Sequence, residues 1–172
     1  MRYTIVAAVL LILNIVPAYP QNQLKAYTIS GQEITCKPNS IVIYYNTISC
    51  HACMELLLSC CKEITQQDSS INLYILIEGS DYIGTMRSST TSLLDYASAE
   101  EMPKVIYDLN PTIEQRYKNQ FNISMSPSVL VFRNDMKPTH ISYKKMFGRT
   151  YNKDKINKLI LKAIHKSKEQ DT

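Results

Sequence analysis

The sequence predicts an α/β domain in which a central mixed β-sheet is flanked by helices. Short apolar runs rich in β-branched residues, which are typical of buried strands, recur along the chain, as at 40–45 and 128–132. They alternate with stretches whose apolar residues repeat every three or four positions, which is the spacing of an amphipathic helix. The 172 residues, of which 45% are hydrophobic and 20% charged, are enough for one domain with a substantial core.

The first residues have the pattern of a secretory signal peptide. Arg2 precedes a mostly apolar run, and Val16-Pro17-Ala18 places small residues at the positions that a signal peptidase reads. The run is shorter than the about 20 residues of a membrane-spanning helix, so a permanent anchor is the less favoured alternative. We therefore expect an extracytoplasmic protein, periplasmic or secreted. Its expected parts are a signal peptide over 1–18, a linker over 19–26, a folded domain over 27–168 and a polar tail over 169–172.

The first half of the expected domain contains a hairpin, two buried strands and a helix between these strands. Two short strands are predicted on either side of a turn at Gly31. The run 40–45 is continuous, apolar and β-branched, as in a buried strand, and 71–78 is the next candidate for such a strand. A helix from about His51 to Gln66 separates them, since one face of it carries Cys53, Leu57, Cys60, Cys61 and Ile64.

A β-α segment is predicted between these elements and the last strands. A short helix at about 92–99 lies in a serine- and threonine-rich stretch, and a strand follows over 105–108. Asn110 can cap a helix and Pro111 can open it, so a second helix is expected to run to about Gln120.

The C-terminal part is predicted to be a hairpin followed by a helix. The strand over 128–132 turns at 133–136 into an antiparallel partner from Thr139 to Phe147. The last helix has an apolar stripe formed by Ile156, Leu159, Ile160, Ala163 and Ile164. Its lysines are expected to form a solvated face.

The residues most suited to chemistry form a C-x-x-C motif, Cys50 to Cys53, between a buried strand and the predicted helix. A helix N-terminus presents unpaired N–H groups and the positive end of the dipole, which favour a thiolate at Cys50. Cys53 lies one turn further on, where its sulfur can reach Cys50 and resolve a mixed disulfide. His51 is a candidate for tuning the thiolate when protonated, the alternative being an exposed helix-start residue. The motif also occurs in zinc and haem sites, but Met54 stands where haem attachment requires histidine.

The order of these features resembles the thioredoxin superfamily, and more closely its exported TlpA/ResA-like thiol-disulfide oxidoreductases. The matching features are the strand 41–45, the Cys50-x-x-Cys53 motif at a helix start, and Ser126-Pro127 directly before the strand 128–132. The resemblance implies a thioredoxin-like fold with an N-terminal hairpin and with 105–120 as a β-α insertion. It also implies that Pro127 is cis, and that Ser126 and Pro127 dock the substrate backbone. The implied partners are protein disulfide or dithiol substrates and a membrane or soluble electron donor or acceptor.

The chain departs from this family at positions that affect the redox chemistry. Ser49 replaces the aromatic residue that often precedes the first cysteine, and the pair between the cysteines is neither Gly-Pro nor Pro-His. That pair tunes the reduction potential, so the direction of electron flow stays open, with a reductase favoured over an oxidase. Tyr44 stands where thioredoxins carry a buried acidic residue that assists proton transfer. A different proton acceptor, such as water or His51, is therefore required.

The remaining cysteines are Cys36, Cys60 and Cys61. On one helix Cys60 lies about 10.5 Å along the axis from Cys53. One zinc ion, with ligands at about 2.3 Å, therefore cannot easily bind both cysteine pairs. We expect Cys60 and Cys61 to pack as small apolar side chains, with a disulfide to Cys36 or an accessory redox relay as alternatives. Neither a metal nor a cofactor is expected.

Glycine spacing and charge argue against several other functions. The four glycines cannot form a dinucleotide-binding motif, and no Lys-Ser/Thr pair follows Gly84 as a P-loop requires. The net charge of +4 is spread along the chain, so no nucleic-acid partner is expected. Separately, the protein is expected to be a monomer. The principal alternative function is a peptide-binding module or holdase of the same fold without redox turnover. Thiol peroxidase activity is disfavoured because Thr47-Ile48-Ser49 lacks the proline typical of that motif.

Overall fold

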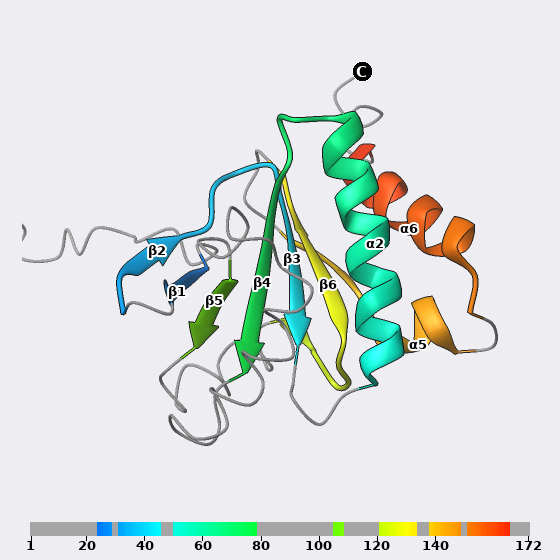
Figure 1. The fold of residues 1–172 in the computed structure, drawn as a ribbon, viewed down its shortest axis with the longest axis horizontal. Helices are drawn as coiled ribbons and strands as arrows, with labels where there is room; N and C mark the ends of the chain where they lie inside the picture. Colours follow the sequence, from blue (N-terminus) through cyan, green and yellow to red (C-terminus); the bar gives the residue numbers. More distant parts are fainter. Residues whose placement is uncertain are drawn as a thin grey trace, which may run out of the picture.

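The structure is a computed structural model that describes residues 24–28, 31–45, 50–78, 105–108, 121–133, 138–148 and 151–165. The described strands form one seven-stranded sheet in the order β2-β1-β5-β4-β3-β6-β7 (Figure 1). The strands are β1 (Lys25–Thr28), β2 (Glu33–Thr35), β3 (Ser40–Tyr45), β4 (Asn72–Glu78), β5 (Val105–Asp108), β6 (Ser128–Phe132) and β7 (Thr139–Ile141). The described helices are α2 (His51–Gln67), α5 (Tyr143–Phe147) and α6 (Lys153–His165).

The sheet is mixed, as the sequence predicts. Strand β3 pairs in parallel with β4, to which α2 connects it, and β4 pairs in parallel with β5. The antiparallel pairs are β3 with β6, β6 with β7, β1 with β5, and β1 with β2. All six residues of β3 are buried, which explains why its sequence is continuously apolar instead of alternating.

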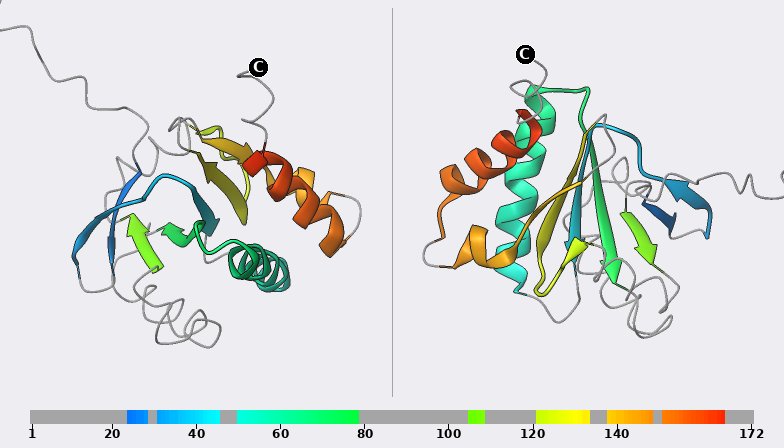
Figure 2. Two further views of the ribbon diagram at one scale, coloured as in Figure 1. Left: turned by 90° about the horizontal axis from the view of Figure 1, so that it is seen from above. Right: turned by 180° about the vertical axis from the view of Figure 1, so that it is seen from behind.

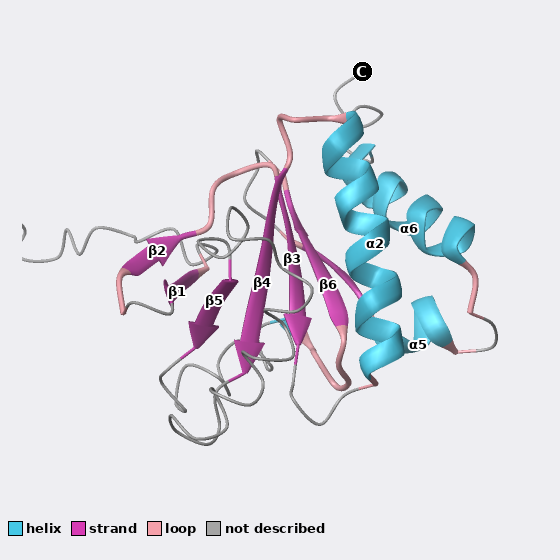
Figure 3. Ribbon diagram, viewed as in Figure 1, coloured by secondary structure: helices cyan, strands magenta, loops and turns pink. Residues whose placement is uncertain are grey.

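The three described helices pack on one side of the sheet (Figures 2 and 3). Because side chains alternate along a strand, Ile41, Ile43 and Tyr45 of β3 enter the core beneath these helices. We call this the helix-side core. Val42 and Tyr44 enter a second core on the opposite face, which we call the far-side core and which also contains Leu24, Ala26, Cys36, Tyr74, Leu76, Phe121, Ile123, Leu130 and Phe132.

Helix α2 begins where the motif predicts. Cys50 is its N-cap, and the apolar face of the helix is buried through Cys53, Met54, Leu57, Leu58, Cys60, Cys61 and Ile64. The helix ends at Gln67, where the backbone of Asp68 becomes extended. The N-terminal end of α2, which carries the cysteine pair, therefore lies next to the C-terminal end of β3.

The expected strand over 139–147 is wrong in its second half. The strand β7 stops at Ile141, and residues 143–147 form the short helix α5 instead. Tyr143, Met146 and Phe147 follow the helical spacing of three and four, which brings Met146 and Phe147 into the helix-side core while Lys144 and Lys145 are exposed. A helix satisfies this pattern, whereas a strand would turn alternate residues to opposite faces.

The folded part also begins earlier than Tyr27. Leu24 and Ala26 are buried in the far-side core and Lys25 opens β1, so these residues belong to the domain and not to a linker. The expected signal peptide over 1–18, the helices at 92–99 and 110–120 and the tail over 169–172 lie outside the described residues. Among the helices that are described, none is long and apolar enough to cross a membrane.

Candidate active site

Cys50 lies at the start of α2, half-buried, with its sulfur directed at the helix. Its Sγ accepts a hydrogen bond from the backbone N–H of Cys53 at 3.3 Å, so the thiol itself caps the helix. The pKa of Cys50 is lowered, first by its hydrogen bond with the Cys53 side chain and then by the one with Tyr151. Both contacts favour the thiolate, as does the positive end of the helix dipole.

Cys53 has the opposite environment, although it lies only one turn further along. Its side chain is buried against the helix-side core, and this desolvation raises its pKa, followed by the hydrogen bond with Cys50. The pair therefore combines an accessible sulfur that ionises readily with a buried sulfur that stays protonated. Such a difference suits a nucleophile and a resolving thiol.

Two tyrosine hydroxyls that the motif does not indicate also contact the cysteine pair. Tyr151 Oη lies 2.9 Å from Cys53 Sγ and 3.4 Å from Cys50 Sγ. Tyr143 Oη lies 3.5 Å from Cys53 Sγ. Their contacts with the sulfurs raise the pKa of Tyr151 strongly and that of Tyr143 to about 12, so both phenols stay protonated at neutral pH.

A run of aromatic rings holds these hydroxyls in place. The ring centroid of Phe147 lies 5.1 Å from that of Tyr143 and 5.8 Å from that of Tyr151, and Phe147 itself is buried. Tyr143 and Phe147 are spaced by four residues, as in a helix, although a strand was expected over 139–147, and Tyr151 lies beyond the end of α5. Their contact with a motif about a hundred residues earlier is a property of the fold and has no local sequence signal.

His51 occupies the first position of α2 and is exposed. Its Nδ1 lies 3.2 Å from Tyr45 Oη at the end of β3. The pKa of Tyr45 is raised, first by burial and then by the negative charge of Cys50. The tuning of the Cys50 thiolate by His51 stays a prediction.

Ser126 and Pro127 lie beside the end of β3. The peptide bond between them is cis, which is the isomer that the family resemblance implies. The Ser126 hydroxyl donates a hydrogen bond of 3.3 Å to the Tyr44 carbonyl, and the register of β3 with β6 pairs Tyr44 with Ser128. The loop is therefore fixed to the strand that leads to Cys50.

Solved structures similar to this chain carry the same arrangement of strands and helices. A secreted disulfide oxidoreductase from Mycobacterium tuberculosis, described as homologous to DsbE of E. coli, has a TM-score of 0.55 and 14% identity, covering 84% of this chain and 98% of that one. A thioredoxin-like protein from Aeropyrum pernix has a TM-score of 0.55 and 11% identity, covering 93% and 98%. A thioredoxin-family thiol:disulfide interchange protein from Chlorobium tepidum has a TM-score of 0.53 and 12% identity, covering 82% and 92%. No protein-family model and no curated protein matches the sequence.

The chain has a thioredoxin-like fold. Within this fold Tyr44, which the sequence resemblance places where thioredoxins carry a buried acidic residue, is buried in the far-side core, whereas Cys53 faces the helix-side core. Tyr44 is thus separated from the cysteine pair by the sheet. The side-chain hydroxyls that contact Cys53 belong to Tyr143 and Tyr151, and not to Tyr44.

The other three cysteines of the thioredoxin-like domain are buried free thiols. Cys36 lies in the far-side core and Cys60 and Cys61 in the helix-side core, so the sheet separates them. A disulfide, whose Cα atoms are at most about 6.8 Å apart, cannot join the two faces without rearranging the sheet. Within the described ranges, no three His, Cys, Asp or Glu residues come together to hold a metal ion.

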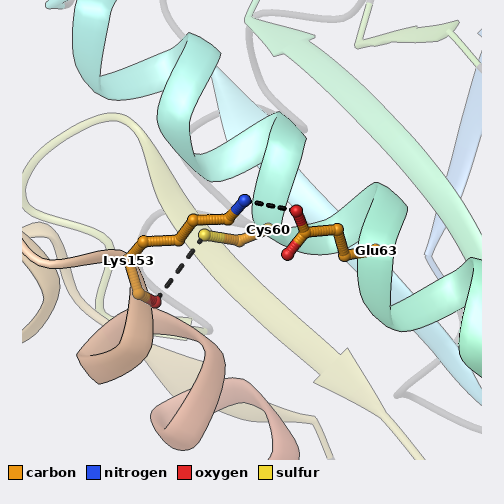
Figure 4. Close-up of polar contacts among 3 residues, drawn as sticks. All are labelled: Cys60, Glu63 and Lys153. Carbon is orange, nitrogen blue, oxygen red and sulfur yellow. Dashed lines mark hydrogen bonds and ion pairs between the residues drawn. The ribbon is translucent and has the colours of Figure 1, made fainter.

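Cys60 lies where α2 meets α6. Figure 4 shows its Sγ facing the backbone carbonyl of Lys153 at 3.9 Å, while the Lys153 ammonium group pairs with Glu63. Burial raises the pKa of Cys60 to about 11 and that of Cys36 to about 12, and it raises that of Cys61 further. These thiols are therefore protonated and packed, as small apolar side chains are.

Proposed function

We propose that this protein is an extracytoplasmic thiol-disulfide oxidoreductase that exchanges disulfides with protein substrates through Cys50 and Cys53. The observation that carries the proposal is the asymmetry of the pair. Cys50 is accessible, caps α2 and has a lowered pKa, whereas Cys53 is buried and has a raised pKa. The thioredoxin-like fold, shared with disulfide oxidoreductases, supports the same function.

In the reducing direction the Cys50 thiolate attacks one sulfur of a substrate disulfide. A bond forms between Cys50 Sγ and that sulfur, the substrate disulfide breaks, and the second substrate sulfur leaves with the electron pair and takes up a proton. Cys53 then loses its proton to water and attacks Cys50 Sγ. This step forms the Cys50–Cys53 disulfide and releases the first substrate sulfur, which also takes up a proton. The dithiol has been oxidised by two electrons and the substrate reduced.

Ser126 and Pro127 are proposed to dock the substrate backbone beside Cys50. The loop is fixed to β3 by the hydrogen bond from Ser126 to Tyr44, which keeps its position relative to the strand leading to Cys50. Met125 and Tyr151 are the exposed large apolar side chains of the described residues, with 53% and 60% of their surface accessible. Met125 adjoins this loop and Tyr151 contacts both sulfurs, and we propose that both side chains offer apolar surface to a substrate.

A reductase is favoured over an oxidase, and it requires an electron donor that reduces the Cys50–Cys53 disulfide after each turnover. Equilibration with glutathione or dithiothreitol buffers, with mass spectrometry to assign the cysteines, measures the reduction potential. A potential near about −250 mV or lower supports a reductase, whereas about −120 mV indicates an oxidant that introduces disulfides.

The catalytic pair is tested by reduction of insulin in the presence of dithiothreitol. We expect Cys50→Ser to abolish the catalysed reaction, and Cys53→Ser to accumulate a mixed disulfide between Cys50 and substrate because no resolving thiol remains. Cys36→Ala is the matched control, since it removes a thiol from the far-side core. Full activity of Cys50→Ser would refute the proposal. A protein that forms no Cys50–Cys53 disulfide at any potential, yet still holds peptides, would be a binding module.

A further inference from the structure

Tyr151 Oη is placed between the two sulfurs of the pair. It lies 2.9 Å from Cys53 Sγ and 3.4 Å from Cys50 Sγ, so both sulfurs are within hydrogen-bonding distance of one hydroxyl. A phenol has a single proton to donate, and it can donate to only one sulfur at a time. The negative charge of the reaction likewise resides on one cysteine at a time.

We propose that the Tyr151 hydroxyl is a shared hydrogen-bond donor that stabilises whichever cysteine carries the negative charge. The inference rests on the proposed function and adds a catalytic residue to it. In the reduced resting state, in which Cys50 is ionised and Cys53 is protonated, the hydroxyl donates to the Cys50 thiolate. In the mixed disulfide it donates to Cys53 as that thiol ionises.

The reaction sequence gives the hydroxyl a different acceptor in each step. When Cys50 bonds to the substrate sulfur, it loses its negative charge and becomes a weak acceptor. Cys53 then passes its proton to water, and the Tyr151 O–H turns toward the thiolate that forms, at the shorter of the two distances. Cys53 attacks Cys50 Sγ, the substrate sulfur leaves with the electron pair and is protonated by water, and the tyrosine keeps its own proton throughout.

The surroundings of Tyr151 suit a donor that does not ionise. Its contacts with the two thiols raise its pKa, so the proton stays on the phenol while either sulfur is charged. Its ring packs against Phe147, which restrains the hydroxyl although most of the side chain is exposed. Among the described residues, the other titratable groups near the pair are Tyr143 from α5 and Tyr45 at the end of β3, whose hydroxyl contacts His51.

Tyr143 provides a matched control, because it is also a phenol on the same aromatic run. Its hydroxyl contacts Cys53 at 3.5 Å, whereas that of Tyr151 contacts both sulfurs. Replacing either tyrosine by phenylalanine removes one hydroxyl and keeps the ring. Tyr143→Phe therefore removes a donor to Cys53 alone, whereas Tyr151→Phe removes the donor that Cys50 and Cys53 share.

The first measurement is the pH profile of Cys50 alkylation by iodoacetamide, in a Cys53→Ser background. We expect Tyr151→Phe to shift the profile to higher pH and Tyr143→Phe to leave it in place. Loss of the hydrogen-bond donor lowers the fraction of Cys50 that is ionised, but it makes each Cys50 thiolate more nucleophilic. With these opposing effects, each unit by which the pKa of Cys50 rises is expected to lower the alkylation rate below that pKa by about threefold.

The second measurement follows release of a small thiol from a mixed disulfide preformed on Cys50 in the protein with both cysteines. Tyr151→Phe is expected to slow this release, since the Cys53 thiolate has lost its nearest donor. Unchanged alkylation and unchanged release in Tyr151→Phe would overturn the proposal. Equal shifts of the Cys50 profile in both tyrosine variants would do the same, because they would show a structural effect of the aromatic run.

Two further readouts complete the test. Thermal unfolding shows whether Tyr151→Phe is folded, and Tyr151→Met, which also lacks the hydroxyl, replaces it if it is not. Insulin reduction by the unmodified protein is measured separately. If the unmodified protein does not reduce insulin while Tyr151→Phe still shifts the alkylation profile of Cys50, the proposed function is contradicted and the hydrogen-bonding role of Tyr151 is retained.

Discussion

The five thiols of the chain differ sharply in exposure and in ease of ionisation. Cys50 is half-buried with a lowered pKa, whereas burial raises the pKa of Cys36 to about 12 and that of Cys60 to about 11. We expect iodoacetamide at neutral pH to alkylate Cys50 in the reduced native protein more than about a hundredfold faster than these two, since the thiolate is the reactive form.

Mass spectrometry of protein quenched at successive times measures this selectivity. Denatured protein is the control, because unfolding exposes all five thiols and removes the difference. Rapid labelling of Cys60 in the native state would contradict its place at the contact between α2 and α6.

Part of the site could be predicted from local sequence, and part could not. Cys50 and Cys53 form a motif at the start of an amphipathic helix, and each feature is contained in adjacent residues. Tyr143 contacts Cys53 and Tyr151 contacts both cysteines from about a hundred residues away, so their role depends on how α5 and the residues after it pack against the start of α2. Both hydroxyls keep their protons, so water or His51 stays the predicted proton acceptor for Cys53.

At the scale of elements, the contact between α2 and α6 combines a buried apolar side with an exposed ion pair. Ile156 and Ile160 of α6 are fully buried in the helix-side core, while Lys153 and Glu63 pair at the surface. We expect Ile160→Ala to lower the free energy of unfolding by about 2–5 kcal/mol, because it leaves a cavity. Lys153→Ala is expected to unfold close to the unmodified protein, since exposed ion pairs contribute little.

Urea denaturation followed by circular dichroism compares these two variants. Lys158→Ala, an exposed lysine on the same helix, is the control for a change of charge. A larger decrease in the free energy of unfolding for Lys153→Ala than for Ile160→Ala would mean that the ion pair, and not the apolar contact, holds α6 in place.

The elements themselves illustrate which sequence patterns are reliable. The predicted strand over 128–132 and the predicted helix from about His51 were confirmed. The first is a short run rich in β-branched residues with turn residues on both sides, and the second keeps one apolar face over several turns. The stretch after Ile141 was misassigned because a hairpin partner was expected there. Its helical spacing covers little more than one turn, and only packing of Met146 and Phe147 on the core decides between the two structures.

At the scale of the whole molecule, one sheet separates two cores. Strand β3 contributes Ile41 and Ile43 to the helix-side core and Val42 to the far-side core, so neither core exists without this strand. We therefore expect both faces to unfold in a single cooperative transition. Buried cysteines report on each face, with Cys36 on one and Cys61 on the other.

Brief alkylation at increasing urea concentrations, read by mass spectrometry, gives a midpoint for each thiol. The midpoints for Cys36 and Cys61 are expected to coincide. Labelling of Cys36 at clearly lower urea would show that the far-side core opens on its own, and that the described sheet is not one cooperative unit.

The outermost strands of the described sheet, β2 and β7, are each three residues long, while the longer strands β3 and β4 lie inside it. An extended chain that paired with either edge would gain few backbone hydrogen bonds, and at β2 it would also meet the ion pair that joins Lys25 of β1 to Glu33 of β2. Short edges and edge charges discourage edge-to-edge aggregation. A protein proposed to exchange disulfides with other proteins is thereby protected from pairing with extended segments of its substrates along its own sheet.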